Sequence, residues 1–278
     1  MRLAELEQHL ASMHELARIV GAMRSIASMR VQEAMRMLES VRQYSALAAA
    51  GVRQALRLGG EPGRAAAHRA RTALVLCTSE AGFVGGFNER LLEAVQADRS
   101  SRDVLLLGSR GLSLARERGI EVGWARPMVT RLASVTGMVE ELLTELDRLI
   151  GTARVMRVEV IFARHRRSGS PEVVREVLFP LEPERGTPSG GAAPLTQLPA
   201  AVLLERLTAL YIFARLTEAA IESLAAENQA RFLAMESARD NVARKLDQLK
   251  QEASRARQEE VTTELLDLVT GGQAINTL

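Results

Sequence analysis

The N-terminal part of the chain carries a long helical pattern of apolar and polar positions. Residues 3–58 contain no proline, and apolar side chains recur there at alternating spacings of three and four residues. Such spacing is typical of a helix that buries one narrow face against another helix. Arg24 is the one charged residue on this stripe, which otherwise consists of Leu3, Leu6, Leu10, Met13, Ala17, Val20, Ala27, Val31, Ala34 and Leu38. We therefore predict a helix over residues 1–58.

The C-terminal part predicts a second and longer helix. Residues 200–270 contain neither proline nor glycine, and leucine, alanine, glutamate, arginine and glutamine predominate. A helix over 200–275 would measure on the order of 100 Å at about 1.5 Å per residue, too long to be stable without a companion. We expect the two terminal helices to pair as a long antiparallel coiled coil, with the intervening residues attached at one end.

A second apolar stripe lies beside the first on the N-terminal helix, and its members are Leu16, Ile19, Met23 and Ile26. A helix in a two-stranded coil should be polar on its outer side, so the extra apolar width indicates a surface for a partner. A broad core face on an alanine- and methionine-rich helix explains the stripe equally well. Both interpretations stay open at this point.

Between the terminal helices, the pattern over residues 70–182 predicts a small α/β domain. Short apolar runs alternate with amphipathic segments, which indicates parallel strands joined by helices. Two alternating runs at the end of this region indicate a hairpin and a mixed sheet edge. The predicted strands are 72–78, 103–107, 120–124, 155–163 and 171–179, and the predicted helices lie within 89–97, 108–119 and 133–150. The fold class is therefore α+β.

The loop after the first predicted strand contains glycines that raise the question of a nucleotide site. Gly82, Gly85 and Gly86 neither precede a Lys-Ser/Thr pair nor give the spacing G-x-G-x-x-G. A tight strand-to-helix turn explains them better. Because no Ser-His-acid set or metal-spaced cluster stands out in the sequence, we predict no catalytic residues, no metal and no cofactor. We expect the carboxylates to lie mostly on solvated helix faces.

Composition narrows the class of protein further. Aromatic residues make up only 3% of the chain, as expected for leucine and alanine packing between helices. A net charge of +2 with interleaved acidic residues argues against a nucleic-acid footprint. The single Cys77 excludes an internal disulfide. Early acidic residues argue against a signal peptide, and the longest uncharged stretch, 186–204, is too rich in proline and glycine to span a bilayer.

Several segments match a known family. Residues 256–272, ARQEEVTTELLDLVTGG, resemble the ARQxxITxELxEIVxG ending of gamma subunits of F-type ATP synthases, and residues 225–242, AAENQARFLAMESARDNV, are similar to the same C-terminal helix. Weaker matches follow in the right order. Residues 21–30, GAMRSIASMR, resemble the family's KAMxMVAxxK, and residues 78–88, TSEAGFVGGFN, resemble TSDxGLCGGYN. Together these matches span nearly the whole chain.

The resemblance implies a non-catalytic rotor subunit with a Rossmann-like domain inserted into the coiled coil. In this family the terminal helices form an axle inside a ring of alternating alpha and beta subunits. The α/β domain lies near the membrane, against the epsilon subunit and the ring of c subunits. Proton or sodium flow turns the axle and drives the catalytic sites on beta through successive conformations. The implied location is the cytoplasmic face of the bacterial inner membrane, as a peripheral subunit that does not insert into it.

The resemblance also implies which residues contact the alpha and beta ring: Met23, Arg24, Arg257, Gln258, Thr262 and Glu264. If Met23 and Arg257 share one level of the coiled coil, paired residue numbers sum to about 280, given equal rise in both helices. We therefore predict that Val20 and Met23 lie beside residues 253–260.

The sequence departs from the family pattern at residues 9–18, at Glu80 and Ala81, and in the short region around 180–199. These departures place it on a divergent branch, for which a sodium-coupled type of synthase is one hypothesis. Two other interpretations compete with the rotor: a coiled-coil scaffold with an α/β head outside any ATP synthase, and a nucleotide-using enzyme. Co-purification of alpha and beta subunits would favour the rotor over the scaffold, whereas nucleotide binding by the isolated chain would favour the enzyme.

Overall fold

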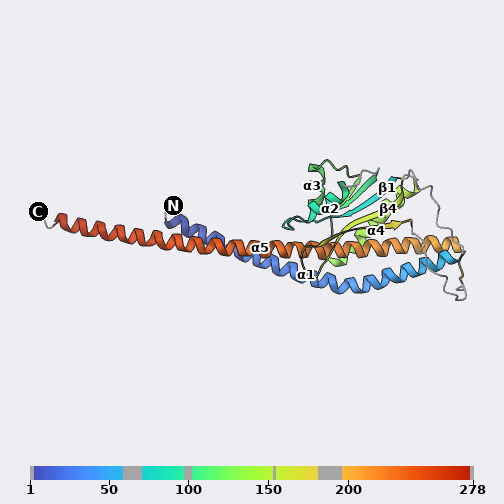
Figure 1. Ribbon diagram of the computed structural model, residues 1–278, viewed down its shortest axis with the longest axis horizontal. Coiled ribbons are helices and arrows are strands. Elements are labelled where there is room, and N and C mark those ends of the chain that lie inside the picture. Colours follow the sequence, from blue (N-terminus) through green and yellow to red (C-terminus); the bar gives the residue numbers. More distant parts are fainter. Residues whose placement is uncertain (1–2, 59–70, 97–101, 153–154, 181–195, 276–278) are drawn as a thin grey trace. The chain divides into compact units, whose positions relative to one another are not determined.

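A long helix opens the described part of the chain and another closes it, with α/β structure between them (Figure 1). The computed structural model describes residues 3–58, 71–96, 102–152, 155–180 and 196–275. The helices are α1 (Leu3–Arg57), α2 (Phe87–Gln96), α3 (Ser109–Glu117), the short 3₁₀ helix η1 (Leu132–Ser134), α4 (Val135–Gly151) and α5 (Ala200–Ile275). The strands are β1 (Arg71–Cys77), β2 (Arg102–Leu107), β3 (Trp124–Arg126), β4 (Val155–Arg164) and β5 (Glu172–Phe179). The predicted fold class, with two long terminal helices and a central α/β region, is confirmed.

The strands form one sheet in the order β3-β2-β1-β4-β5. The first four strands are parallel and β5 is antiparallel to β4, so the predicted mixed edge is confirmed. The strand predicted at 120–124 is wrong except for Trp124. Residues before Trp124 are used in a turn, where the Ile120 N–H donates to the Ala115 carbonyl at the end of α3. Pairing with β2 begins only where Trp124 lies opposite Leu105.

Two apolar layers cover the two faces of the sheet. On one face, Val75, Leu105 and Val160 pack with buried side chains of α4, α1 and α5. On the other face, Leu74 and Leu76 pack with α2 and α3. Helix α5 contributes to both layers, because its Ala225 joins the first cluster and its Ala226 and Ala230 join the second. This part of α5 therefore passes an end of the sheet from one face to the other.

The chain forms two compact units, one made of Met1–Ile26 with Phe232–Leu278 and one made of Ala27–Arg231. In the first unit, Leu6 packs against Leu249 and Ala253, so the start of α1 pairs with the part of α5 around these two residues. In the second unit, the same two helices run side by side against the sheet (Figure 1). The division of the chain into segments 1–58, 70–182 and 200–275 stays a prediction.

The helices pair antiparallel, but the predicted register is wrong. In the first unit, Arg24 bonds to Glu236 and Glu7 bonds to Arg257, so paired numbers sum to about 260 and not 280. Met23 therefore lies near the level of residue 237, and residues 253–260 lie near the start of α1. The register follows from the apolar stripe, because Leu6 and Ala253 must meet to be buried. The predicted register rests on a family motif in each helix separately, and such motifs do not determine how the two helices pair.

The two connections between the sheet region and the terminal helices lie mostly outside the described residues. They hold the glycine and proline cluster at 59–63, the basic segment at 64–71 and most of the proline-rich stretch at 180–199.

Candidate functional site

The second apolar stripe of α1 is exposed. Leu16 is 42%, Ile19 is 52% and Ile26 is 47% accessible, whereas Met23 is half-buried. These side chains therefore do not form a broad core face, and that interpretation is wrong within the described chain. Exposed aliphatic side chains spaced three and four residues apart are typical of a surface that a partner covers.

Arg24 is tied to the opposite helix. Its Nη1 donates to Oε2 of Glu236 at 2.6 Å, and its guanidinium lies 5.8 Å from the ring centroid of Phe232. The hydrogen bond from Arg24 holds the pKa of Glu236 below its usual value. Arg24 thus interrupts the buried stripe without leaving its charge unpaired, and it fixes the level at which α1 meets α5.

The remaining predicted contact residues lie further along α5 and are exposed. Arg257 Nη2 donates to Oε1 of Glu7 at 2.7 Å, with both side chains more than half accessible. The Gln258 carbonyl accepts the Thr262 hydroxyl at 2.7 Å, a local helix contact that leaves the Gln258 amide free to bind elsewhere. Glu264 is exposed beside accessible apolar side chains, those of Val261 and Leu265.

The structure separates the predicted contact residues into two levels. Met23 and Arg24 lie near Glu236, and Arg257 lies about twenty residues further along α5, or roughly 30 Å at 1.5 Å per residue. The expectation that Met23 and Arg257 lie at a similar level is therefore wrong. Each level combines a basic side chain with exposed aliphatic side chains.

The carboxyl ends of β1 and β4 form the place where open α/β sheets usually hold a ligand, because the connections diverge there. Here α5 fills that place. The Ser223 hydroxyl donates to the carbonyl of Cys77 at 3.1 Å, and the Gln229 amide donates to carbonyls of Arg166 and Gly169 in the hairpin. The chain's own helix thus occupies the position that the nucleotide-using interpretation requires.

Charged groups of α5 hold the glycine loop in the same region. Arg231 donates to the Gly82 carbonyl and, at 2.6 Å, to Oε1 of Glu227. Burial raises the pKa of Glu227, and Arg231 and the Glu80 N–H only partly offset that effect. Phe83 and Gly85 have positive φ angles, 61° and 56°, as a tight turn requires.

Four glutamates are exceptions to the sequence-based expectation. Carboxylates are predicted mostly on solvated helix faces, whereas Glu159, Glu218, Glu222 and Glu227 are buried. The sequence does contain a signal, since the alanines at 219, 220, 225, 226 and 230 let other backbones approach α5 from several sides. A helix segment surrounded by protein has to pair its charges internally.

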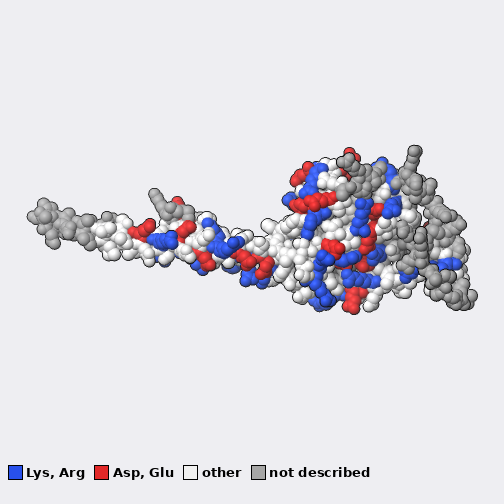
Figure 2. All heavy atoms as spheres, viewed as in Figure 1, with Lys and Arg blue, Asp and Glu red and all other residues white. Residues whose placement is uncertain are grey.

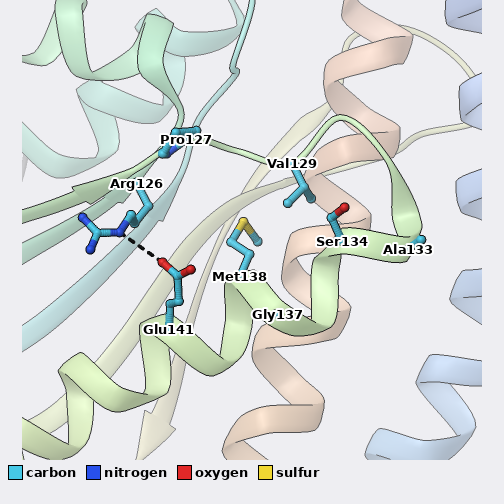
Figure 3. A pocket seen from close by; sticks show the side chains of 8 residues that line it. All are labelled: Arg126, Pro127, Val129, Ala133, Ser134, Gly137, Met138 and Glu141. Atoms are coloured by element: carbon cyan, nitrogen blue, oxygen red, sulfur yellow. Dashed lines mark hydrogen bonds and ion pairs between the residues drawn. The ribbon is translucent and has the colours of Figure 1, made fainter.

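An open hollow of about 560 Å³ lies between α4 and the segment after β3. Figure 3 shows Arg126 and Glu141 bonded to each other at its rim, with Met138 and Val129 nearby. Because these two charges neutralise each other, the hollow lacks the convergent polar groups of a reaction centre. Among the described residues, no group of three or more acidic, histidine or cysteine side chains could hold a metal ion.

Acidic and basic side chains are interspersed over the face of the molecule that Figure 2 shows. Interspersed charges of both signs are typical of a solvated surface. Across the ranges that the structure describes, no helix is both long enough and apolar enough to cross a membrane.

Comparison with known proteins places the chain in a family. The family model described as ATP synthase matches residues 2–275. The ATP synthase gamma chain of Chlorobium luteolum is 30% identical over 219 residues, which cover 75% of each protein. That of Prosthecochloris aestuarii is 28% identical over 215 residues, covering 74% of this chain and 73% of the relative.

Solved structures show the same fold. The rotor of the Euglena gracilis mitochondrial ATP synthase aligns with a TM-score of 0.67 at 13% identity, covering 93% of this chain and 98% of that one. The central stalk and c-ring structure from Tetrahymena thermophila contains a chain that aligns with a TM-score of 0.59 at 18% identity, covering 79% and 99%.

The structure has the features of a stalk protein that acts through its partners. It has two long paired helices, an α/β sheet whose ligand crevice is filled by α5, and exposed apolar side chains at two levels of the helices. The chain belongs to the ATP synthase gamma family. It is a non-catalytic rotor subunit of a rotary ATP synthase, whose complex makes or hydrolyses ATP. The scaffold and nucleotide-enzyme alternatives are therefore wrong.

Proposed function

We propose that the helix pair contacts the ring of alpha and beta subunits at two levels. The first level consists of Met23 and Arg24 with the exposed stripe of Leu16, Ile19 and Ile26. The second consists of Arg257, Gln258, Thr262 and Glu264 with Val261 and Leu265. The observation that supports this proposal is the exposure of aliphatic side chains at both levels, which is costly in water unless a partner covers them.

The chemistry of the two levels suits a surface that turns. Aliphatic contacts are non-directional, so they tolerate several orientations of a partner. Arg24 is already bonded to Glu236, and Arg257 to Glu7, so neither guanidinium has to form a permanent ion pair with the ring. Rotation couples to catalysis because each orientation of the helix pair binds open and closed beta subunits with different free energies.

The proposal extends to the other partners and to the location. The epsilon subunit and the c-subunit ring would engage the α/β region, and the Tetrahymena structure that aligns with this chain contains a central stalk and a c-ring. A rotor driven by a ring in the membrane has to lie beside that membrane. We place the protein peripherally at the cytoplasmic face of a bacterial inner membrane, in keeping with the bacterial relatives. A sodium-coupled branch remains a hypothesis beside proton coupling.

The double variant Arg257→Ala with Gln258→Ala tests the second level in the reconstituted complex of gamma, alpha and beta subunits. We expect the ATPase rate to fall by roughly threefold or more, as loss of one or two charge-assisted hydrogen bonds would cause. The matched control is Arg255→Ala, which removes an exposed arginine about 160° from Arg257 around the same helix. An unchanged rate in the double variant, with complex assembled, would refute this contact.

A further inference from the structure

Six charged side chains form a closed ring in the unit made of residues 27–231. Each arginine of the ring contacts two glutamates, and each glutamate contacts two arginines. In order around the ring the residues are Arg42, Glu222, Arg164, Glu176, Arg215 and Glu218. The three positive and three negative charges balance.

The contacts of the ring have defined geometry. Arg164 Nη2 lies 3.0 Å from Glu176 Oε1, and its Nε lies 3.7 Å from Glu222 Oε1. Arg215 Nη1 lies 2.5 Å from Glu218 Oε2, whose Oε1 lies 3.8 Å from Arg42 Nε. Arg42 with Glu222 and Arg215 with Glu176 complete the ring. Arg215 donates hydrogen bonds to two carboxylates, whereas Arg42 and Arg164 each donate to one and lie at ion-pair distance from a second. The hydrogen bonds fix orientation as well as distance.

The ring joins four elements at one place. Arg42 belongs to α1, Arg164 to β4 and Glu176 to β5, while Arg215, Glu218 and Glu222 belong to α5. Every contact except Arg215 with Glu218 therefore bridges two different elements. The ring ties both long helices to each other and to the antiparallel edge of the sheet.

Burial makes the ring hard to open. The Glu222 side chain is 1% accessible and that of Glu218 is 10% accessible, whereas Arg42 is 47% accessible at an open hollow of about 340 Å³. A buried carboxylate that loses its arginine is left desolvated and unpaired. Apolar side chains could stabilise the same junction equally well, but they would resist sliding and twisting less, because their contacts are non-directional.

We propose that this ring of six charged side chains holds α1, α5 and the sheet at fixed angles to one another while torque passes between them. The proposal rests on the rotor function, since a rotor must take up torque in one part and deliver it from another. The six side chains act as positioning residues, and they set the torsional stiffness of the subunit.

The test measures twist in the assembled complex of gamma, alpha and beta subunits. The alpha and beta subunits are fixed to a surface in the absence of nucleotide. A rod-shaped probe is attached to the cysteine of the Ser113→Cys variant, which lies at an exposed position on α3. The angular variance of the probe is inversely proportional to torsional stiffness. We expect Arg42→Met to raise this variance roughly twofold, because it removes two of the six contacts. Arg42→Lys should restore only part of the stiffness, because lysine keeps the charge but not the two-nitrogen geometry.

The matched control is Arg148→Met, which breaks the ion pair between Arg148, whose side chain is 59% accessible, and Glu145 within the same helix, α4. It should leave the variance unchanged. If Arg42→Met does not assemble, Glu222→Gln, which keeps the size of the side chain, takes its place. Unchanged variance in the assembled complex of Arg42→Met or Glu222→Gln would overturn the proposal, even if the melting temperature falls. The six charged side chains would then stabilise the fold without setting its torsional stiffness.

Failure of the rotor function would look different. In that case the unaltered chain would not assemble with alpha and beta subunits at all. The fastening would then be tested in the isolated chain, by a double-mutant cycle of Arg42→Met and Glu222→Gln on unfolding by urea. Coupling between the two changes would support the ring, and strict additivity would overturn it.

Discussion

Helix α5 runs through both compact units and is buried differently in each. In the unit of residues 27–231, every residue of α5 from Leu216 to Arg231 is buried, charged side chains included. In the unit of 1–26 with 232–278, burial between 241 and 260 narrows to one stripe at spacings of three and four: Val242, Leu246, Leu249 and Ala253. The first segment is a core element, and the second is half of a two-stranded coil.

The difference shows how one helix serves two tasks. Where α5 is enclosed, several of its charges are paired with charges on neighbouring elements, as Glu222 is with Arg42 of α1, and such contacts hold the elements in one arrangement. Where only a stripe is buried, the rest of the helix surface remains available to partners. The region that has to transmit force is thus cross-linked by a network of ion pairs, and the region that has to turn against other subunits presents apolar side chains with single ion pairs between its two helices, such as Arg257 with Glu7.

The largest expected contrast concerns two leucines of α1. Leu38 is fully buried in the sheet unit, so Leu38→Ala should lower the free energy of unfolding by about 2–5 kcal/mol. Leu16 is 42% accessible, so Leu16→Ala should change it by less than about 0.5 kcal/mol. Urea denaturation of the isolated chain measures both. In the assembled complex, Leu16→Ala should instead lower the ATPase rate, and equal destabilisation by the two variants would erase the contrast.

Two glycines in helices should respond to alanine with opposite signs. At Gly111, a Cβ would lie 2.0 Å from Oγ1 of Thr78, which is held by its hydrogen bond to the Leu107 carbonyl. Gly111→Ala should therefore destabilise the chain by about 1–3 kcal/mol. At Gly21, a Cβ would meet nothing within 4 Å, so Gly21→Ala should stabilise α1 by about 0.5–1 kcal/mol. Melting curves that shift in the same direction would contradict this prediction.

The smallest contrast is the dependence of stability on pH. Burial raises the pKa of Glu227 above 4.5, so the folded chain holds the proton of Glu227 more tightly than the unfolded chain does. The stability that this protonation contributes falls as pH rises through the raised pKa. Arg24 lowers the pKa of Glu236 below 4.5, so that contribution is present above 4.5 and is lost as pH falls through the lowered pKa. Glu227→Gln and Glu236→Gln should each flatten one side of the profile, as urea denaturation between about pH 3 and 8 would reveal.

The fold could be predicted from the sequence largely because its periodicity is strong. The stripe from Leu6 to Leu38 and the absence of helix breakers over 200–270 determine both terminal helices. The buried strands follow from short apolar runs such as that of β1. The third strand could not be placed correctly, because Ile120 and Val122 look like strand residues locally but are used in the turn after α3.

The contact residues could be nominated by resemblance, but their arrangement could not. A one-dimensional pattern gives the buried face of each helix and leaves the register between helices undetermined, so the pairing of Arg24 with Glu236 emerges only in three dimensions. The ring around Glu222 could not be predicted for a related reason. Its members come from four elements and are separated by up to 180 residues, so no local spacing reveals them.

The rotor function is tested most directly by rotation of the probe on Ser113→Cys while the complex, fixed through its alpha and beta subunits, hydrolyses ATP. We expect stepwise rotation in one direction, because the gamma chain is the rotor and its sheet packs against segments of both long helices. Sustained ATP hydrolysis by the assembled complex with the probe stationary would contradict it.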